Sequence, residues 1–502
     1  MAQTEMGMSG HTKDSKAEPI ASRPRDRWAG AVLAVVFAFT PFAPAVADAD
    51  TTSREIAERL AGAIRFETVS YEDAADFRGE PFDALEGYLR ETYPRVFREL
   101  RLEKVNGYTL LFKWKGSDET LPPGLFMSHT DVVPVSEAAA EAWKEHPYGG
   151  AIKDGYVWGR GALDVKTGVI LWLEAVEALL EEGIQPTRTI YLSFGHDEEI
   201  GGTEGAKAVA ALFAERGIHL GFLFDEGGMI FKDFPLVPGK IVATVVTAEK
   251  AHFTVVLKAR GVSGHSSMPP KHTAIGKLSR AITRVENNPM PARISLPVRE
   301  MMEAAAPYLP FGQRFAMTNL WLMGGTVKRS FLKNDLNAAL VRTTFAATLI
   351  EGGVKENVIP ELAKATINVR ILPGDTPKEV LGHLSKVIDD PEIEIIGDNW
   401  GEAAPPASAD GDAYQLAKAA VLDEIPEAVV IPSLVPGATD TRHFVGIADE
   451  ILRFVPMHVG MEQVGGAHGR DERIAVEPLA RSRAIAIGMV RRAVSGIRLD
   501  DR

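Results

Sequence analysis

Cysteine is absent from this chain of 502 residues. Its absence excludes a disulfide framework, a thiolate-bound metal and a cysteine nucleophile. An excess of basic residues is lacking too, because the formal net charge is -13. Nucleic acids and anionic membranes both favour a basic face, so the overall charge disfavours either class of partner. Hydrophobic residues at 45% and charged residues at 25% are ordinary for a globular protein, and the length suits two domains or one large domain with an insertion.

The N-terminal residues lack an apolar run of the roughly 20 residues that span a bilayer. Arginines at positions 23, 25 and 27 precede a shorter run from Trp28 to Phe42, and an A-x-A pattern follows at Ala45 to Ala47. A basic start, a short apolar run and such a cleavage pattern are typical of a secretory signal peptide. We expect residues 1–47 to be this peptide and the processed protein to be periplasmic or secreted, without a stable membrane span. A retained membrane anchor is the alternative.

Strand-like and helical patterns alternate through the first half of the chain. Apolar strand patterns end at His129, Phe194 and Phe224, and helical patterns cover Val169 to Leu180 and Ala206 to Ala214. This alternation predicts a three-layer α/β domain. We assign its first part to residues 48–249 and its second part to residues 400–502, where the helical pattern from Leu479 to Ala493 is expected to cover the sheet.

Residues 250–399 show a different order of elements, β-α-β-β-α-β, which is ferredoxin-like and can close on itself as an inserted domain. An extra segment from Met301 to Asp335 interrupts this order and is rich in methionine and aromatic residues. Such a segment is usually core or subunit interface. The alternative is an apolar wall for a long substrate, because flexible Met-rich surfaces also suit such ligands.

Polar clusters follow several of these strands and turns. His129, Asp164 and Glu199 come from three successive elements and offer the nitrogen and oxygen ligands that hydrolytic zinc sites use. Asp131 lies two residues after His129 on a strand end, so it can orient the imidazole. In the doublet at 198–199 both carboxylates cannot easily face one ion, so one is naturally a ligand and the other is free to act as a general base. Taken singly, each of these residues could be an ordinary solvated loop charge; taken together they predict a metal centre.

The set of motifs resembles the aminoacylase/carboxypeptidase family of dinuclear zinc metallopeptidases. The resemblance is carried by the clusters at 129–131, 159–164, 197–199, 225–227 and 467–469. The segments 263–270, 288–291 and 356–360 are similar to the branch that holds carboxypeptidase S and the N-fatty-acyl-amino-acid synthase/hydrolase. The resemblance covers nearly all of the chain after residue 47. It implies a zinc-exopeptidase catalytic domain with an inserted lid and dimerisation domain.

The resemblance also implies a role for each matched residue. Asp164 would bridge two zinc ions, one held also by His129 and Asp225 and the other by Glu199 and His468. Glu198 would be the general base and Asp131 would hold His129. Asp225 is followed by Glu226, and relatives use either type of acid here, so either residue is the possible ligand. Substrate would be met by three residues of the inserted domain: His265, Asn357 and Arg370. The hinge sequence Glu249-Lys250-Ala251 has Ala where the family usually has Gly.

These roles predict a zinc amidohydrolase that cleaves N-acyl, above all N-fatty-acyl, amino acids next to a free carboxylate, and the same site must catalyse the reverse condensation. The alternatives are a metallo-carboxypeptidase acting on dipeptides or peptide C-termini and a binding protein without catalysis. The presence of Glu198 and of every ligand position argues against the last. We expect a small-molecule substrate and no nucleic acid. Lids of the family that the chain resembles often form dimers, so the resemblance allows a homodimer through the lid.

Overall fold

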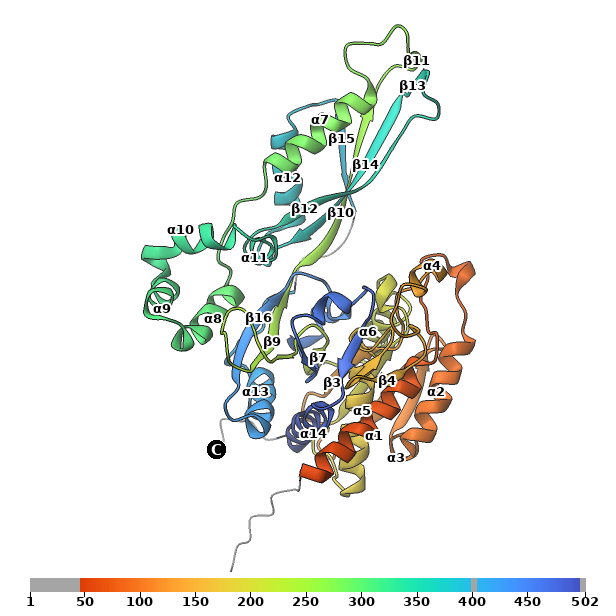
Figure 1. The fold of residues 1–502 in the computed structure, drawn as a ribbon, viewed down its shortest axis with the longest axis vertical. Helices are drawn as coiled ribbons and strands as arrows, with labels where there is room; N and C mark the ends of the chain where they lie inside the picture. Colours follow the sequence, from red (N-terminus) through yellow and green to blue (C-terminus); the bar gives the residue numbers. More distant parts are fainter. Residues whose placement is uncertain (1–45, 399–403, 497–502) are drawn as a thin grey trace, which may run out of the picture. The chain divides into compact units, whose positions relative to one another are not determined.

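The structure is a computed structural model that describes residues 46–398 and 404–496 (Figure 1). The predicted signal peptide therefore lies almost wholly outside the described residues. Among the helices that are described, none has both the length and the hydropathy needed to cross a membrane.

The chain enters the fold through helices α1 (Val46–Ile64), η1 (Ala74–Asp76), α2 (Glu80–Thr92) and α3 (Pro94–Glu99). Ser53 lies inside α1 and is almost fully buried. Its hydroxyl donates to the carbonyl of Glu477 and accepts from the backbone N–H of Ala480. Ser53 thus ties the first helix to the start of the last one.

A ten-stranded sheet forms the centre of the larger region, in the order β1-β2-β6-β3-β7-β17-β9-β8-β18, with β16 also paired to β9. These strands are β1 (Arg101–Val105), β2 (Thr109–Trp114), β3 (Gly124–His129), β6 (Ile190–Gly195), β7 (Leu220–Asp225), β8 (Ile230–Phe231), β9 (Val242–Glu249), β16 (Val429–Val435), β17 (Ala448–Arg453) and β18 (His458–Val459). The first two strands are joined by a tight turn in which Asn106 and Gly107 both have positive φ, as the Asn-Gly pair predicts.

Helices cover both faces of this sheet, so the predicted three-layer fold is confirmed. Along β3, Phe126 packs with one set of helices, while its neighbours Leu125 and Met127 pack with another. Adjacent strand residues point to opposite faces, so each face must be covered. One face carries α1, α5 (Lys166–Glu181), α13 (Asp412–Glu424) and α14 (Leu479–Ser495), and the other carries α6 (Ala206–Glu215) with η4 (Asp440–Phe444).

Short elements complete this region. They are α4 (Glu137–Ala140), η2 (Glu198–Ile200), η5 (Val464–Gly466) and a small antiparallel sheet of β4 (Ala151–Lys153), β5 (Tyr156–Trp158) and β19 (Arg473–Ala475).

The second sheet has the ferredoxin-like order β12-β14-β10-β15. Its strands are β10 (Ala251–Arg260), β12 (Thr344–Gly352), β14 (Leu362–Ile371) and β15 (Ile393–Gly397), and its helices are α7 (Ala274–Asn287) and α12 (Pro377–Ile388). Alternate residues of β10 and β14 are buried, because both helices cover a single face. A two-stranded ribbon, β11 (Gly264–His265) with β13 (Val358–Ile359), extends from this sheet.

The Met-rich segment folds as α8 (Leu296–Ala305), η3 (Ala306–Tyr308), α9 (Phe311–Thr318), α10 (Leu320–Phe331) and α11 (Asp335–Val341). Met301 and Met302 are buried in a cluster that includes Val242 of β9 and Ile431 of β16. These two methionines are core residues, so the alternative expectation that they line a substrate groove is wrong for them.

Candidate metal centre

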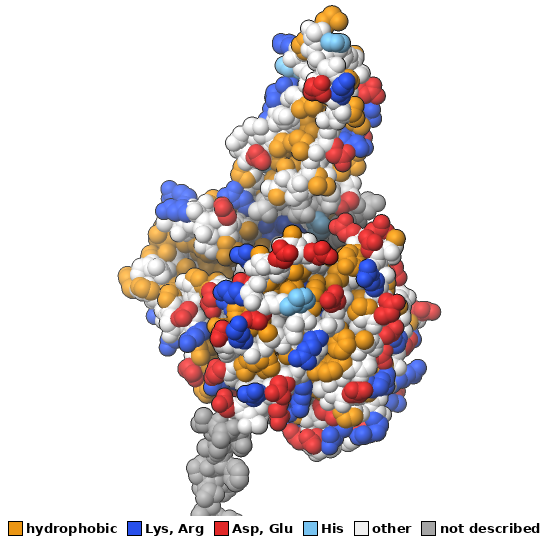
Figure 2. Space-filling view, turned by 45° about the vertical axis from the view of Figure 1, so that its right-hand side comes forward, with side chains coloured by type: hydrophobic (Ala, Val, Ile, Leu, Met, Phe, Trp, Pro, Cys, Tyr) orange, Lys and Arg blue, Asp and Glu red, His pale blue; other side chains and the backbone are white. Residues whose placement is uncertain are grey.

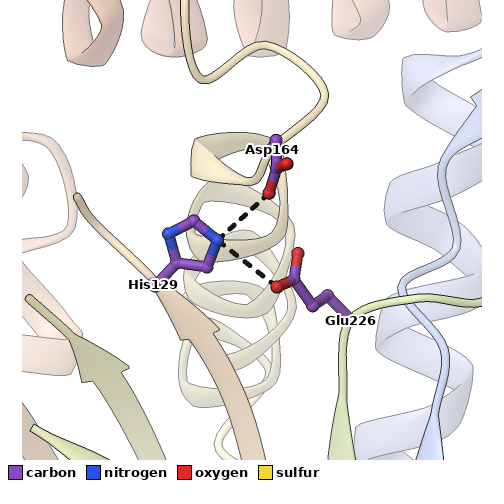
Figure 3. Close-up of side chains that lie close together, drawn as sticks. All are labelled: His129, Asp164 and Glu226. Atoms are coloured by element: carbon purple, nitrogen blue, oxygen red, sulfur yellow. Dashed lines mark hydrogen bonds and ion pairs between the residues drawn. The ribbon is translucent and has the colours of Figure 1, made fainter. Parts of the chain in front are cut away.

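His129 is the last residue of β3 and only 1% exposed. Its Nδ1 lies 2.9 Å from the carbonyl oxygen of Asp131, which leaves Nε2 to face the site. Nε2 lies 3.2 Å from Oδ1 of Asp164 and 3.4 Å from Oε1 of Glu226 (Figure 3). A strand end, a loop and the end of a second strand thus meet at one imidazole nitrogen.

A second group lies on the other side of Asp164. Nε2 of His468 is 3.1 Å from Oδ2 of Asp164 and 2.8 Å from Oε2 of Glu199. Asp164 therefore belongs to both groups and offers a different oxygen to each. One carboxylate between two sets of nitrogen and oxygen donors is the arrangement that a pair of metal ions about 3.5 to 4 Å apart requires.

Asp131 is fully buried and does more than face His129. Its carboxylate accepts hydrogen bonds from the Ser70 hydroxyl at 2.7 Å, from the backbone N–H of Glu198 at 3.2 Å and from that of Glu199 at 3.1 Å. Because these bonds fix the first residues of η2, Asp131 positions both carboxylates of the doublet as well as the imidazole of His129.

Asp225 does not belong to either group among the described residues, whereas its neighbour Glu226 does. Asp225 ends β7 and is buried, and one of its oxygens has no hydrogen-bond partner. Successive residues at a strand end point in different directions, so only one of the two can face His129. The side chain of Glu226 reaches His129 in this structure, and which of the two acids binds the metal stays a prediction for the substitutions at 225 and 226.

The charges at the site favour a bound cation. Burial, together with the nearby carboxylates of Asp164 and Asp225, raises the pKa of Glu226 to about 8 against the opposing effect of His129. Burial and Glu226 also raise the pKa of Glu198 well above its ordinary value. One oxygen of Glu199 is buried without a partner. Carboxylates crowded in this way are stabilised in their ionised form by metal ions, and the donor set of imidazole and carboxylate suits a divalent metal.

Glu472 is a buried carboxylate near these ligands that the sequence reasoning missed. Its Oε1 accepts from the backbone N–H groups of Gly161, Leu163 and Asp164, and its Oε2 accepts from Nη1 of Arg160 at 2.6 Å. Arg160 also donates to the carbonyl of Gly469. The pair therefore joins the loop of Asp164 to the loop of His468. Its position four residues after His468 was the available signal, but only the fold reveals the contacts.

The predicted substrate residues lie in the smaller sheet and its ribbon. Arg370 is in β14, half-buried, and donates to Oδ1 of Asn368 at 3.2 Å. Burial and the nearby Arg442 lower its pKa, while Glu249 and Glu198 raise it, so the guanidinium lies within electrostatic reach of the proposed base. His265 and Asn357 instead sit in the exposed ribbon, where the backbone N–H of Ser266 donates to the Asn357 carbonyl. Neither belongs to the metal-ligand groups.

Asp440, in the Gly-rich stretch at 437–443, lies beside the loop that follows Glu199. It is buried, and a Cβ on Gly202 would lie 1.9 Å from its Oδ1, so it packs against the loop that follows Glu199. The cap of η4 is Thr439, whose hydroxyl accepts from the backbone N–H of Thr441. Nε2 of His443 donates to the Gly201 carbonyl, 3.0 Å away, and so supports the same loop.

The hinge between the two sheets is held from both sides. Glu249, the last residue of β9, accepts from Thr439, Thr441 and Arg453 of the larger region. The next residue, Lys250, donates to the carbonyls of Ala339 and Arg342 and to the hydroxyl of Thr344. Two successive side chains thus anchor the chain to elements on either side of the hinge.

Comparison with known proteins gives the family of the chain. Residues 125–492 match the model of the peptidase family M20/M25/M40. The chain is 38% identical over 429 residues to a Dictyostelium discoideum protein named "Probable carboxypeptidase S-like 2", covering 84% of this chain and 82% of that one. It is 37% identical over 428 residues to the mouse (Mus musculus) N-fatty-acyl-amino acid synthase/hydrolase PM20D1, covering 84% of each.

Among solved structures, the M20 family metallo-carboxypeptidase Sso-CP2 from Sulfolobus solfataricus is similar in fold, with a TM-score of 0.64 at 19% identity, covering 88% of this chain and 99% of that one. Its fold agrees with a catalytic α/β region that carries an inserted domain. Together with the family match over most of the chain, these findings show that the protein belongs to the peptidase family M20/M25/M40 and is a hydrolase of this metal-dependent family.

Proposed function

We propose that the protein holds two zinc ions and hydrolyses N-acyl amino acids next to their free carboxylate. The observation that carries the proposal is the shared carboxylate of Asp164, which joins His129 and Glu226 on one side to Glu199 and His468 on the other. When bound there, zinc ions would polarise the scissile carbonyl and lower the pKa of a water molecule towards neutrality.

Glu198 is the proposed general base. It directly precedes the ligand Glu199, and the backbone contacts with Asp131 fix where both side chains begin. Its raised pKa suits a group that must first accept a proton from water and then donate it to the leaving nitrogen.

Arg370 is the proposed anchor for the substrate carboxylate. Its guanidinium can bind a carboxylate through two parallel hydrogen bonds, and Lys250 and Arg442 add positive charge near it. Asn357 and His265 of the ribbon are proposed to meet the substrate carbonyl, His265 by stabilising the negative charge that develops on its oxygen.

The substrate class follows from the relatives. The mouse relative is named for N-fatty-acyl amino acids, and the Dictyostelium relative is named carboxypeptidase S-like. Both names describe an amide bond next to an amino acid, and both agree with a cation near a hydrolytic metal site. N-fatty-acyl amino acids are the first candidate and C-terminal peptide bonds the second. The reverse condensation uses the same transition state, but dilute aqueous surroundings favour hydrolysis.

The test is a comparison of kcat/KM for an N-oleoyl amino acid, the N-acetyl derivative of the same amino acid, and a dipeptide. We expect the N-oleoyl compound to be the best substrate, and we expect its carboxamide analogue to be poor because it cannot pair with Arg370. Arg370→Gln should raise KM for the free acid, while Arg260→Gln, at the exposed end of β10, should not. A dipeptide preference would favour the carboxypeptidase alternative.

A second comparison tests the base. Glu198→Gln should keep the bound metal and lose about 10² to 10⁴ in kcat, because the amide preserves shape but cannot accept the proton. Wild-type turnover in this variant would place the base elsewhere.

Two further parts of the proposal concern the setting of the enzyme. Cleavage near residue 47 and export would give a periplasmic or secreted protein, and N-terminal sequencing of the processed chain tests this. A homodimer formed through residues 250–399 is the proposed assembly, and light scattering tests it.

A further inference from the structure

Four large apolar side chains are exposed on the helical hairpin formed by α9 and α10. Phe311 is 82% exposed, Phe315 42%, Trp321 85% and Leu322 57%. The two phenylalanine rings stack on each other at 6.2 Å. Figure 2 shows hydrophobic and basic side chains together on the left-hand lobe of the view. We call these four residues the hairpin patch. Exposed apolar patches of this kind mark interaction surfaces.

The other side of the same hairpin is already packed. Val327 and Phe331 of α10 are buried in the cluster of Met301 and Met302, and Met317 and Leu320 pack against it. The hairpin is therefore held by its own core contacts, and the hairpin patch is not needed for them. A helix that is apolar on both sides needs a second apolar environment in which to bury its exposed side.

The local charge differs from that of the whole chain. Residues 304–334 contain no Asp or Glu, although the formal net charge of the chain is -13. The same residues contain the cations Arg314, Lys328, Arg329 and Lys333. Among the described residues, no carboxylate forms an ion pair with any of these cations. Beside Trp321 lies a cavity of about 560 Å³ whose lining includes the cations Arg293, Arg299 and Lys328. Its lining includes one carboxylate, that of Glu303.

We propose that the hairpin patch docks on the surface of an anionic phospholipid bilayer. A lipid interface offers apolar chains for Phe311 and Leu322, a headgroup level that suits Trp321, and negative charge for the four cations. A second copy of this chain bound patch to patch would place the same unpaired cations opposite each other, which is unfavourable. The net negative charge of the chain opposes contact with an anionic surface elsewhere, so the cations of this segment set the orientation of the described residues on the membrane.

The docking is independent of catalysis and of the proposed substrate. No residue of the hairpin patch belongs to the metal-ligand groups. If the enzyme does act on fatty-acyl amino acids, which is the proposed function, the hairpin would bring it to the surface where such amphiphiles collect. Vesicle binding measured without substrate therefore tests the docking whether or not that function holds.

The chain without cysteine allows a direct test. A cysteine placed at Leu322 (Leu322→Cys) can be labelled at a single site with a polarity-sensitive fluorophore, in the full chain or its processed form. We expect a blue shift and an increase in fluorescence with vesicles of phosphatidylglycerol and phosphatidylcholine, and little change with phosphatidylcholine alone. The control is Leu349→Cys, 63% exposed on β12, which should not respond. Because each label reports only its own surroundings, binding through the N-terminal apolar run would not mimic the result.

Substitutions then separate the contributions. Phe311→Ser with Trp321→Ser should weaken vesicle binding at least about tenfold, because both large apolar side chains are lost from the interface. Replacing Arg314, Lys328 and Arg329 by Gln should weaken it by about fivefold per cation and remove most of its salt dependence. The matched control replaces the exposed Lys355, Lys378 and Lys386 by Gln. Hydrolysis of a soluble N-acetyl substrate should stay unchanged throughout.

Three outcomes would overturn the proposal. A label at position 322 that does not respond to anionic vesicles would do so, as would an equal response at position 349. Vesicle binding that survives Phe311→Ser with Trp321→Ser, together with a change from dimer to monomer in light scattering, would show that a second copy of the chain covers the patch instead.

Discussion

Glu472→Gln tests whether the buried ion pair of Glu472 with Arg160 holds the loops of Asp164 and His468 together. Glu472 is fully buried, and Arg160 is 3% exposed. Burial raises the pKa of Glu472. Both of its oxygens nevertheless accept hydrogen bonds, so the contacts fit the ionised carboxylate. In the variant, one amide oxygen can still accept from the backbone of the Asp164 loop, but the amide NH₂ then faces the guanidinium.

The expected cost follows from the uncompensated charge. Removing one partner of a buried ion pair typically costs about 3 to 5 kcal/mol. We expect a loss of this size in the free energy of unfolding, measured by urea denaturation of the metal-loaded protein. Competition with a chelator should also show weaker metal binding, because Glu472 fixes the loop that carries Asp164. The exposed Glu477→Gln serves as the matched control and should change stability by less than about 0.5 kcal/mol.

A double variant tests the reason for the loss. Adding Arg160→Met to Glu472→Gln removes the unpaired guanidinium, so the pair should be more stable than the sum of the single losses predicts. If the single variant is as stable as the wild type, or if the two losses simply add, the ion pair does not hold the two loops as described.

Two other predictions concern the hinge and the pH dependence of stability. Lys250→Met should lower the free energy of unfolding by about 1 to 3 kcal/mol, because three acceptors lose their donor while the cost of burying an ammonium is removed; urea denaturation that shows no loss would contradict the anchoring role. Burial and Arg481 lower the pKa of His458 to about 4, below its ordinary 6.5, so the folded protein binds fewer protons than the unfolded chain between these values. The stability that comes from keeping His458 neutral is thus fully present above pH 6.5 and is lost as the pH falls towards 4. At pH 4 this loss amounts to about 3 kcal/mol. When unfolding is measured at pH 7 and at pH 4, His458→Gln should lose about 3 kcal/mol less stability than the wild type over this range. Equal losses in the two proteins would refute the lowered pKa of His458.

The alternation of apolar strands and helices was enough to predict the three-layer region and the ferredoxin-like insertion, because both depend on local periodicity and short connections. The polar residues His129, Asp164, Glu199 and His468 could be picked out because each follows a strand or a Gly-rich turn. Their meeting at one point depends on the order of strands, which local patterns do not determine.

Other features depended on contacts between distant segments. Whether Asp225 or Glu226 faces His129 is decided by where β7 ends, and the sequence allowed either. Glu472 and Ser53 act through backbone groups far away in the chain, so their neighbours in sequence gave little signal. The methionines of α8 could have been groove or core, and only their packing on β9 and β16 showed that they are core.

The central claim, that five residues hold two metal ions around Asp164, can be measured directly. Metal-free protein is titrated with zinc, and bound metal and turnover are recorded on the same samples. The account predicts two ions per chain with activity rising to the second equivalent, a reduced stoichiometry in Glu226→Gln, and two ions in Asp225→Asn. A fully active wild-type preparation with one ion or none per chain would contradict it.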